Sequence, residues 1–130
     1  MNLWWQQLLL VMGGGALGAA GRFLVGGWAT RQLGHGFPWG TLIVNLAGAF
    51  AAGFLLVWLE GRGPNALLWR AFLMVGLLGG LTTFSALMVE ALIHARAARL
   101  DLMLAYLAAS LFGGVTLVFL GARLGESLRG

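Results

Sequence analysis

The chain has 130 residues, of which 60% are hydrophobic and 9% charged, and its mean hydropathy is +0.90. This composition is typical of a membrane protein and excludes an ordinary soluble domain. The formal charge of +4 comes from arginines scattered at the ends of apolar runs, which favours anchoring at a membrane interface over nucleic-acid binding. The absence of cysteine excludes disulfides and thiol chemistry.

A first membrane span is predicted over residues 4–25. No basic region precedes it and no polar domain follows it, so we expect a retained span rather than a cleaved signal peptide. Gly14 and Gly18 form a GxxxG pair on which another helix can pack closely. Because a charge inside the bilayer is costly, Arg22 either extends to the membrane interface or faces a water-filled vestibule.

The second predicted span, residues 39–59, is about as long as the hydrocarbon core of a bilayer is thick. Trp39 and Trp58 mark its two interfaces. Asn45 is the only strongly polar residue inside it. Because a buried amide must find partners, Asn45 either bonds a neighbouring helix or donates its NH₂ group into a pore.

The third predicted span, residues 66–93, contains Gly79-Gly80 near its middle, followed by two threonines and a serine. A glycine pair weakens a helix, and loose backbone at that depth is tolerated only where protein or a water-filled path surrounds it. We therefore predict that the glycine pair breaks this helix near the bilayer midplane. The break serves either an ion site or only close helix packing. Glu90, near the end of the span, is either interfacial or lines a vestibule.

The fourth predicted span, residues 102–122, contains no charge. Tyr106 and Ser110 share one face, and the hydroxyls form a polar track unless each bonds the carbonyl of its own preceding turn. The connections between the spans are too short to hold a domain. The sequence therefore predicts one all-α transmembrane domain over residues 1–130, with four transmembrane helices.

The arginines are distributed almost evenly between the two sides of the membrane. With four spans, one side carries Arg62, Arg70, Arg123 and Arg129, and the other carries Arg31, Arg96 and Arg99, with Arg22 undecided. An arginine and lysine excess normally fixes orientation, so a balanced chain can insert both ways. The count predicts an antiparallel, dual-topology homodimer, and a polar path at the midplane would need that second subunit. The alternative is one orientation favoured by a small margin.

Three stretches carry a family resemblance: Gly-Ala-Ala-Gly-Arg at 18–22, Gly-Thr-Leu-Ile-Val-Asn-Leu-Ala-Gly at 40–48, and Gly-Gly-Leu-Thr-Thr-Phe-Ser at 79–85 with Glu90. Together they resemble the bacterial fluoride channel family, Fluc or CrcB, over nearly the whole chain. The resemblance implies a fluoride-selective channel in the bacterial inner membrane. In that family fluoride enters cells as HF, dissociates, and leaves passively through the channel. The resemblance also implies an antiparallel homodimer in membrane lipid, with two pores and a central sodium ion.

The resemblance further implies roles for individual residues. Asn45 matches a pore hydrogen-bond donor, and Phe84 matches a pore phenylalanine whose positive ring edge can face an anion. Gly79 and Thr82 match sodium ligands that act through backbone carbonyls. The remaining matches are the pore-lining positions Thr41, Ser85, Tyr106 and Ser110 and the vestibule positions Arg22 and Glu90.

The sequence departs from the family pattern at two pore positions. Leu87 stands where the family usually has a second phenylalanine. Gly114 stands where a further hydroxyl is common, one turn beyond Ser110, and Thr116 lies off that face. Both departures concern the pore and its rate rather than the fold.

Two other functions are alternatives to a channel for a small membrane protein of this kind. A small dual-topology multidrug transporter needs a titratable carboxylate deep in the membrane, but the first span has none and Glu90 lies near a helix end. A non-conducting membrane assembly subunit would explain the glycines but not the grouping of Asn45, Thr82, Thr83 and Ser85. No nucleophile–base pair or metal-binding cluster in the sequence indicates an enzyme.

Overall fold

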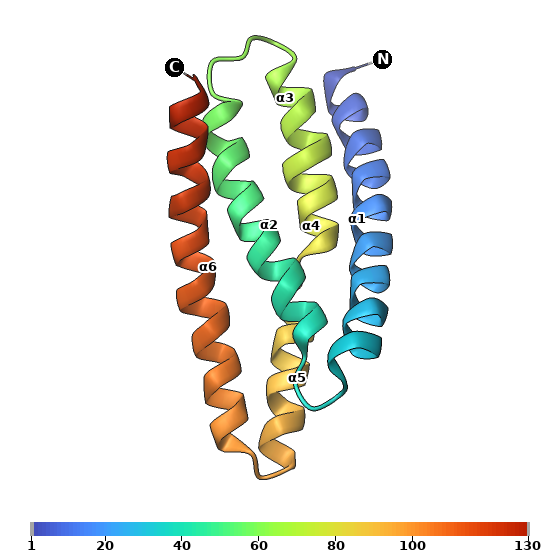
Figure 1. Cartoon of the computed structure of the whole chain (residues 1–130). Coiled ribbons are helices and arrows are strands. Elements are labelled where there is room, and N and C mark those ends of the chain that lie inside the picture. Colours follow the sequence, from blue (N-terminus) through green and yellow to red (C-terminus); the bar gives the residue numbers. More distant parts are fainter. Residues whose placement is uncertain (1, 130) are drawn as a thin grey trace.

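The computed structural model describes residues 2–129, which form four helical spans joined by short connections (Figure 1). In chain order the elements are α1 (Leu3–Leu33), α2 (Trp39–Trp58), α3 (Ala66–Trp69), the π-helix η1 (Arg70–Leu78), α4 (Gly79–Leu81), α5 (Phe84–Arg96) and α6 (Leu100–Arg129). Elements α3 to α5 make up the third span. All four spans are long and apolar enough to cross a membrane. The prediction of an all-α chain with four such spans is confirmed.

Three spans are longer than the sequence predicts. Helix α1 continues past residue 25 and ends before Gly34, whose φ of 85° is one that glycine adopts without strain. The third span reaches Arg96 rather than residue 93, and α6 covers Leu100–Arg129 rather than 102–122. The predicted ends followed the fall in hydropathy, but helical hydrogen bonds are local and continue into the polar interface. Helix α2 ends at Trp58, within one residue of the prediction.

The third span is interrupted at two threonines. Helix α4 ends at Leu81, and Thr82 (φ −85°, ψ 155°) and Thr83 (φ −152°, ψ 122°) are extended before α5 begins. Gly79 and Gly80 are themselves helical, so the prediction that the glycine pair makes the break is wrong in position. At the break Thr83 Oγ1 accepts from Ala86 N in place of a helical carbonyl. Thr82 Oγ1 donates to Leu78 O, which also accepts the last helical bond from Thr82 N.

The break moves the third span from one neighbour to another. Before it, η1 and α4 pack against α1; after it, α5 packs against α6 (Figure 1). The segment before the break also contains the π-helix η1, which the sequence did not predict. Stretches of π-helix are rare and occur frequently at functional sites. The interruption therefore separates two halves that belong to different helix pairs.

Glycines set the close approach of two helix pairs, α1 with the third span and α2 with α6. A Cβ atom on Gly14 would lie 2.8 Å from Leu77 N, and one on Gly80 would lie 2.5 Å from Gly15 O. The GxxxG pair of α1 therefore packs closely on another helix, as the sequence predicted. The structure identifies that partner as the third span, and Gly80 belongs to the same contact. Gly53, Gly121 and Gly125 play this part between α2 and α6. Small residues at such crossings let helix backbones approach within a membrane.

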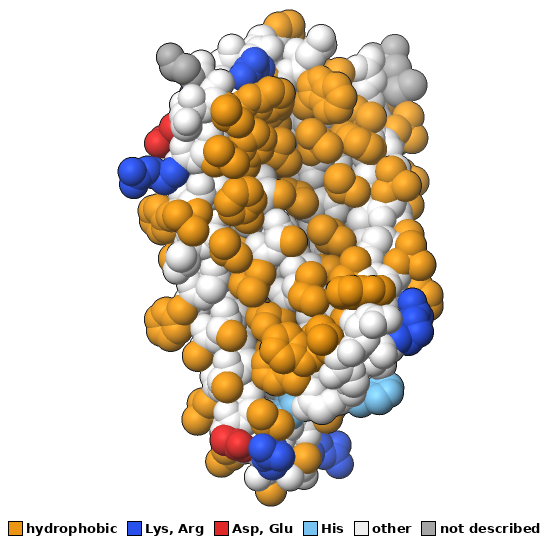
Figure 2. Space-filling view, in the orientation of Figure 1, with side chains coloured by type: hydrophobic (Ala, Val, Ile, Leu, Met, Phe, Trp, Pro, Cys, Tyr) orange, Lys and Arg blue, Asp and Glu red, His pale blue; other side chains and the backbone are white. Residues whose placement is uncertain are grey.

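The surface of the molecule is mainly apolar. Figure 2 shows hydrophobic side chains over most of one face, with charged side chains gathered mostly toward the two ends. Many large hydrophobic side chains are exposed, among them Phe23 (79%) and Phe112 (69%). In water such a surface would aggregate, so it belongs in hydrocarbon.

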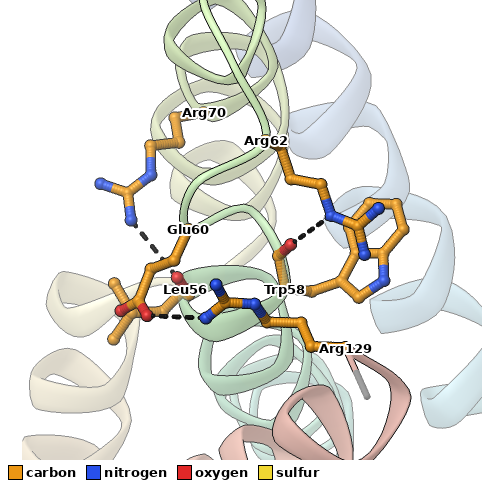
Figure 3. Close-up of polar contacts among 6 residues, drawn as sticks. All are labelled: Leu56, Trp58, Glu60, Arg62, Arg70 and Arg129. Carbon is orange, nitrogen blue, oxygen red and sulfur yellow. Dashed lines mark hydrogen bonds and ion pairs between the residues drawn. The ribbon is translucent and has the colours of Figure 1, made fainter.

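One end of the molecule carries a group of arginines near the C-terminal end of α2 (Figure 3). Arg62 Nε donates to Trp58 O at 2.9 Å, and its guanidinium lies 4.3 Å from the centre of the Trp58 ring. Arg70 Nη2 donates to Leu56 O at 3.3 Å, and Arg129 pairs with Glu60 at 3.1 Å. Two of these arginines therefore bond the last carbonyls of α2, where the helix dipole favours positive charge.

Candidate functional site

A pocket opens directly beside the break in the third span. Its volume is about 420 Å³, and it is bordered by α2, η1, α4, α5 and α6. Eight residues singled out in the sequence line it: Asn45, Gly79, Thr82, Thr83, Phe84, Leu87, Ser110 and Gly114. We call it the break pocket. The helix break thus brings together residues from three of the four spans.

Asn45 holds the break by a pair of hydrogen bonds to one residue. Its Nδ2 donates to Thr83 O at 3.0 Å, and Thr83 N donates to its Oδ1 at 2.8 Å. The amide thus takes the place of helical partners for both backbone groups of Thr83. An amide nitrogen carries two hydrogens, so the second N–H of Asn45 remains for another acceptor. The first alternative from the sequence, a bond to a neighbouring helix, is therefore what the structure shows, and Asn45 also lines the break pocket. Its role as a donor in a pore stays a prediction.

The hydrogen bonds at the break release two backbone carbonyls. In a continuous helix Thr83 N would donate to Gly79 O, but it donates to Asn45 instead. Likewise Ala86 N would donate to Thr82 O, but it donates to Thr83 Oγ1 at 3.2 Å, which caps α5. The carbonyls of Gly79 and Thr82 therefore lose their helical donors. Two oxygens freed in this way fit a hard cation, which prefers oxygen ligands.

Phe84 and Leu87, the two pore positions that the family resemblance singles out on the third span, lie at the start of α5. The Phe84 side chain is 74% exposed and borders the break pocket. Leu87 lies one turn further along α5 and borders the same pocket. Ser85 is exposed and is not among the residues that line the pocket; its Oγ lies 3.5 Å from Thr83 Oγ1. A phenyl ring in the open face of a pocket can present its positive edge to an anion.

Ser110 supplies a hydroxyl from α6. Its Oγ is buried, and within residues 2–129 it has no hydrogen-bond partner. It lines the break pocket together with Gly114, the next small residue on the same face. A buried hydroxyl without a partner is costly, so this one is free to bond a species in the pocket.

A second polar group lies further along α5 and consists of Thr41, Glu90 and Tyr106. Thr41 Oγ1 donates to Glu90 Oε2 and Tyr106 OH donates to Glu90 Oε1, each at 3.0 Å. Tyr106 is fully buried, and its ring packs edge-on against Phe37 at 5.4 Å between centroids. The structure therefore does not bring Thr41 and Tyr106 into the break pocket, but joins them in a cluster around the carboxylate.

Arg22 lies beside the break rather than at a helix end. Its Nε donates to Gly80 O at 3.2 Å, across the contact between α1 and α4. It also lines a wide pocket of about 650 Å³ together with Arg31 and Thr41. Arg22 thus bonds a backbone carbonyl near the break and borders an open pocket. Its placement at a vestibule stays a prediction.

Sequence reasoning assigned no individual role to three residues that the structure places at these sites. Thr83 caps α5 and is the backbone partner of Asn45. Arg31 shares the wide pocket with Arg22. His94 lies one helical turn from Glu90, with Nδ1 3.0 Å from Glu90 O, and lines a pocket of about 280 Å³ with Thr41 and Glu90. Thr83 left a signal in the sequence because it stands inside the motif at 79–85. His94 left one because residues four apart, here Glu90 and His94, share a helix face.

A family model described as CrcB-like protein, Camphor Resistance (CrcB) matches residues 9–122. The chain belongs to the CrcB family. Relatives named fluoride-specific ion channel FluC cover nearly the whole chain. One from Xanthomonas axonopodis pv. citri (strain 306) is 56% identical over 97% of this chain and 95% of the relative. One from Xylella fastidiosa (strain M23) is 55% identical over 95% of this chain and 92% of the relative.

A more distant relative matches over a similar length. The protein named fluoride-specific ion channel FluC from Thermus thermophilus is 46% identical over 96% of this chain and 98% of that protein. The family membership that the three sequence stretches indicated is therefore confirmed. The CrcB assignment and the four apolar spans together make this a multi-pass membrane protein.

Proposed function

We propose that this CrcB-family chain forms a fluoride-selective channel that exports fluoride passively across the bacterial inner membrane. Relatives that match almost its whole length are named fluoride-specific ion channels. Channels of this kind are not enzymes, because they leave their substrate chemically unchanged. The single observation that carries the proposal within the chain is the break pocket, where an amide, a phenyl ring and an unpaired hydroxyl meet.

The chemistry of the break pocket suits a small, strongly hydrated anion. Fluoride loses water only where other hydrogen-bond donors replace it, and Asn45 and Ser110 each have a hydrogen to donate. The exposed ring of Phe84 adds a positive edge. The break lies near the middle of the third span, and we propose that it lies near the bilayer midplane.

We propose that the path continues from the break pocket toward the cluster of Thr41, Glu90 and Tyr106. Ser110 and Tyr106 are four residues apart on α6, which supports a continuous polar track. We propose that Ser85, which is exposed next to Phe84, joins this path in the dimer. Arg22 and Arg31 in the wide pocket give it a positive potential that attracts anions. Glu90 keeps its carboxylate bonded to two hydroxyls, which limits its repulsion of the permeating ion.

We propose that the working form is an antiparallel homodimer with two pores. The break pocket is open on one side, and both Phe84 and Gly79 are exposed there. A polar pocket open to lipid would be costly, so a second copy must cover it. Arg22 lies at the break and counts toward neither end, which leaves four arginines at one end and three at the other. So small a difference supports insertion in both orientations.

We propose a sodium ion at the centre of this dimer, held by the carbonyls of Gly79 and Thr82 from each copy. Their diverted helical donors, described above, support this assignment. The ion would supply positive charge and bind the two breaks to each other. The chain's own part is to hold the carbonyls open, which Asn45 and Thr83 do.

Fluoride efflux from liposomes that contain the purified protein tests the proposal, with a fluoride electrode as the readout and chloride-loaded liposomes as the control. We expect rapid fluoride release without a proton gradient and little chloride release. Release that requires a proton gradient would instead indicate a transporter, including one of the multidrug class. No release of either ion would indicate a non-conducting assembly subunit.

A further inference from the structure

An apolar groove, separate from the break pocket, lies at the end of the molecule that holds both termini. It runs between α1 and the first half of the third span and has a volume of about 430 Å³. Its lining includes Trp4, Leu8 and Val11 from α1, Leu67 from α3, and Arg70 and Val75 from η1. Arg70 is the one charged residue in this lining. We call it the Arg70 groove.

Arg70 forms no salt bridge with any carboxylate of residues 2–129, where the salt bridges are Arg99–Asp101 and Arg129–Glu60. Arg70 is half-buried, and one of its five N–H groups bonds Leu56 O (Figure 3). The other N–H groups remain for an anion beside the groove. An arginine held at a membrane end without a counter-ion attracts anionic lipid headgroups.

We propose that the Arg70 groove binds an anionic phospholipid, with its phosphate on the Arg70 guanidinium and an acyl chain along Leu8, Val11 and Val75. From Trp4 to Val11 the groove follows about 10 Å of helix, enough for the upper part of an acyl chain. Trp4 lies at the same end as Arg70, and tryptophan is enriched at the headgroup level of membranes. The lining thus matches both halves of a lipid.

A neighbouring groove provides an internal comparison. It has a volume of about 380 Å³ and is lined by Leu10, Asn65, Leu68, Trp69 and Phe72, none of which is charged. It offers hydrocarbon contact without a cation, so it cannot select for an anionic headgroup. The difference between the two grooves rests on Arg70.

A lipid is the better occupant of the Arg70 groove than a second copy of the chain. The open break pocket, which a second copy has to cover, is lined by α2, α4, α5, α6 and η1 and by nothing from α1. The Arg70 groove is lined by α1, α3 and η1. The two linings share only η1, and at different residues. On the dimer proposed above, a copy that covers the break pocket leaves the groove to the bilayer.

The test compares thermal unfolding of the purified protein in detergent with added phosphatidylglycerol, phosphatidylcholine, or glycerol phosphate without acyl chains. We expect phosphatidylglycerol to raise Tm more than phosphatidylcholine does, and glycerol phosphate to have no effect. The difference between the two lipids should be largely lost in Arg70→Gln. It should also be lost in Val75→Phe, which fills the groove and leaves Arg70 in place. For each variant, the Tm with added lipid is compared with the Tm of the same variant without lipid. A variant that is less stable from the start therefore does not change the comparison.

Arg123→Gln, at an exposed arginine on α6, is the matched charge control and should keep the full difference. Leu68→Phe, in the uncharged groove, is the matched volume control. Equal loss in Arg70→Gln and Arg123→Gln would mean that surface charge in general attracts the lipid, and it would overturn the site. An undiminished lipid difference in Arg70→Gln or in Val75→Phe would overturn it as well. The same Tm shift with glycerol phosphate would exclude the acyl-chain part of the proposal.

Discussion

Asn45 and Thr83, 38 residues apart in the chain, are joined by two hydrogen bonds that replace the helical bonding of Thr83. Asn45 Nδ2 donates to Thr83 O at 3.0 Å, and Thr83 N donates to Asn45 Oδ1 at 2.8 Å. One side chain of α2 thus fixes the backbone of the third span at its break. The same bonds free the carbonyl of Gly79 and hold Asn45 at the edge of the break pocket.

Replacement of Asn45 by alanine should abolish fluoride efflux and lower stability. The substitution leaves Thr83 N–H and C=O without their partner, at about 1–3 kcal/mol for each buried group. It also removes a hydrogen-bond donor from the break pocket. Liposome efflux and Tm measure the two effects. Asn65→Ala, at an exposed asparagine in a connection, should change neither. Wild-type efflux from Asn45→Ala would contradict a role for the amide in the pore.

Phe84 and Leu87 test whether an aromatic edge matters in the break pocket. Phe84→Leu should reduce fluoride efflux to background, because leucine has no positive ring edge. Leu87→Phe adds a ring one turn away and should preserve or raise efflux. Leu111→Phe, at an exposed position of α6, is the control and should have no effect. Near wild-type efflux from Phe84→Leu would end the claim that a ring edge is needed here.

Sodium should stabilise the dimer through the carbonyls at the break. We expect a higher Tm in sodium chloride than in the chloride salt of N-methylglucamine, a cation too large for the site. Thr83→Ala should reduce this sodium effect, because Ala86 N–H, freed from Thr83 Oγ1, can return to Thr82 O. Loss of the cap itself should cost about 1 kcal/mol.

Thr116→Ala serves as the control for the sodium experiment, since Thr116 is exposed on α6. It should leave the difference between the two salts unchanged. A Tm that is the same in both salts for the wild-type protein would argue against a bound sodium ion.

A tag at the C-terminus should be found on both sides of the membrane in similar amounts. The reason is the four-against-three distribution of arginines between the two ends. Protease or thiol-reagent access to the tag in intact cells measures it. Two or three lysines added at the C-terminus should fix one orientation and reduce efflux when that variant is expressed alone, whereas added glutamines should not. A wild-type tag on one side only would refute dual topology.

The sequence by itself determined the four apolar spans and the family. Hydropathy over a span is a local sum, and the stretches 40–48 and 79–85 are contiguous, so neither needs knowledge of the fold. The close packing at Gly14 and Gly18 was also predictable, because a helix places residues four apart on one face.

Only the tertiary structure decided where the break lies and what holds it. Gly79 and Gly80 weaken a helix, but their contact with α1 keeps them helical, and the interruption moves to Thr82 and Thr83. The position of Arg22 on Gly80 O and the cluster around Glu90 likewise depend on contacts between distant segments. Hydrogen bonds of this kind depend on which helices lie side by side. A local pattern of residue types does not predict which helices these are.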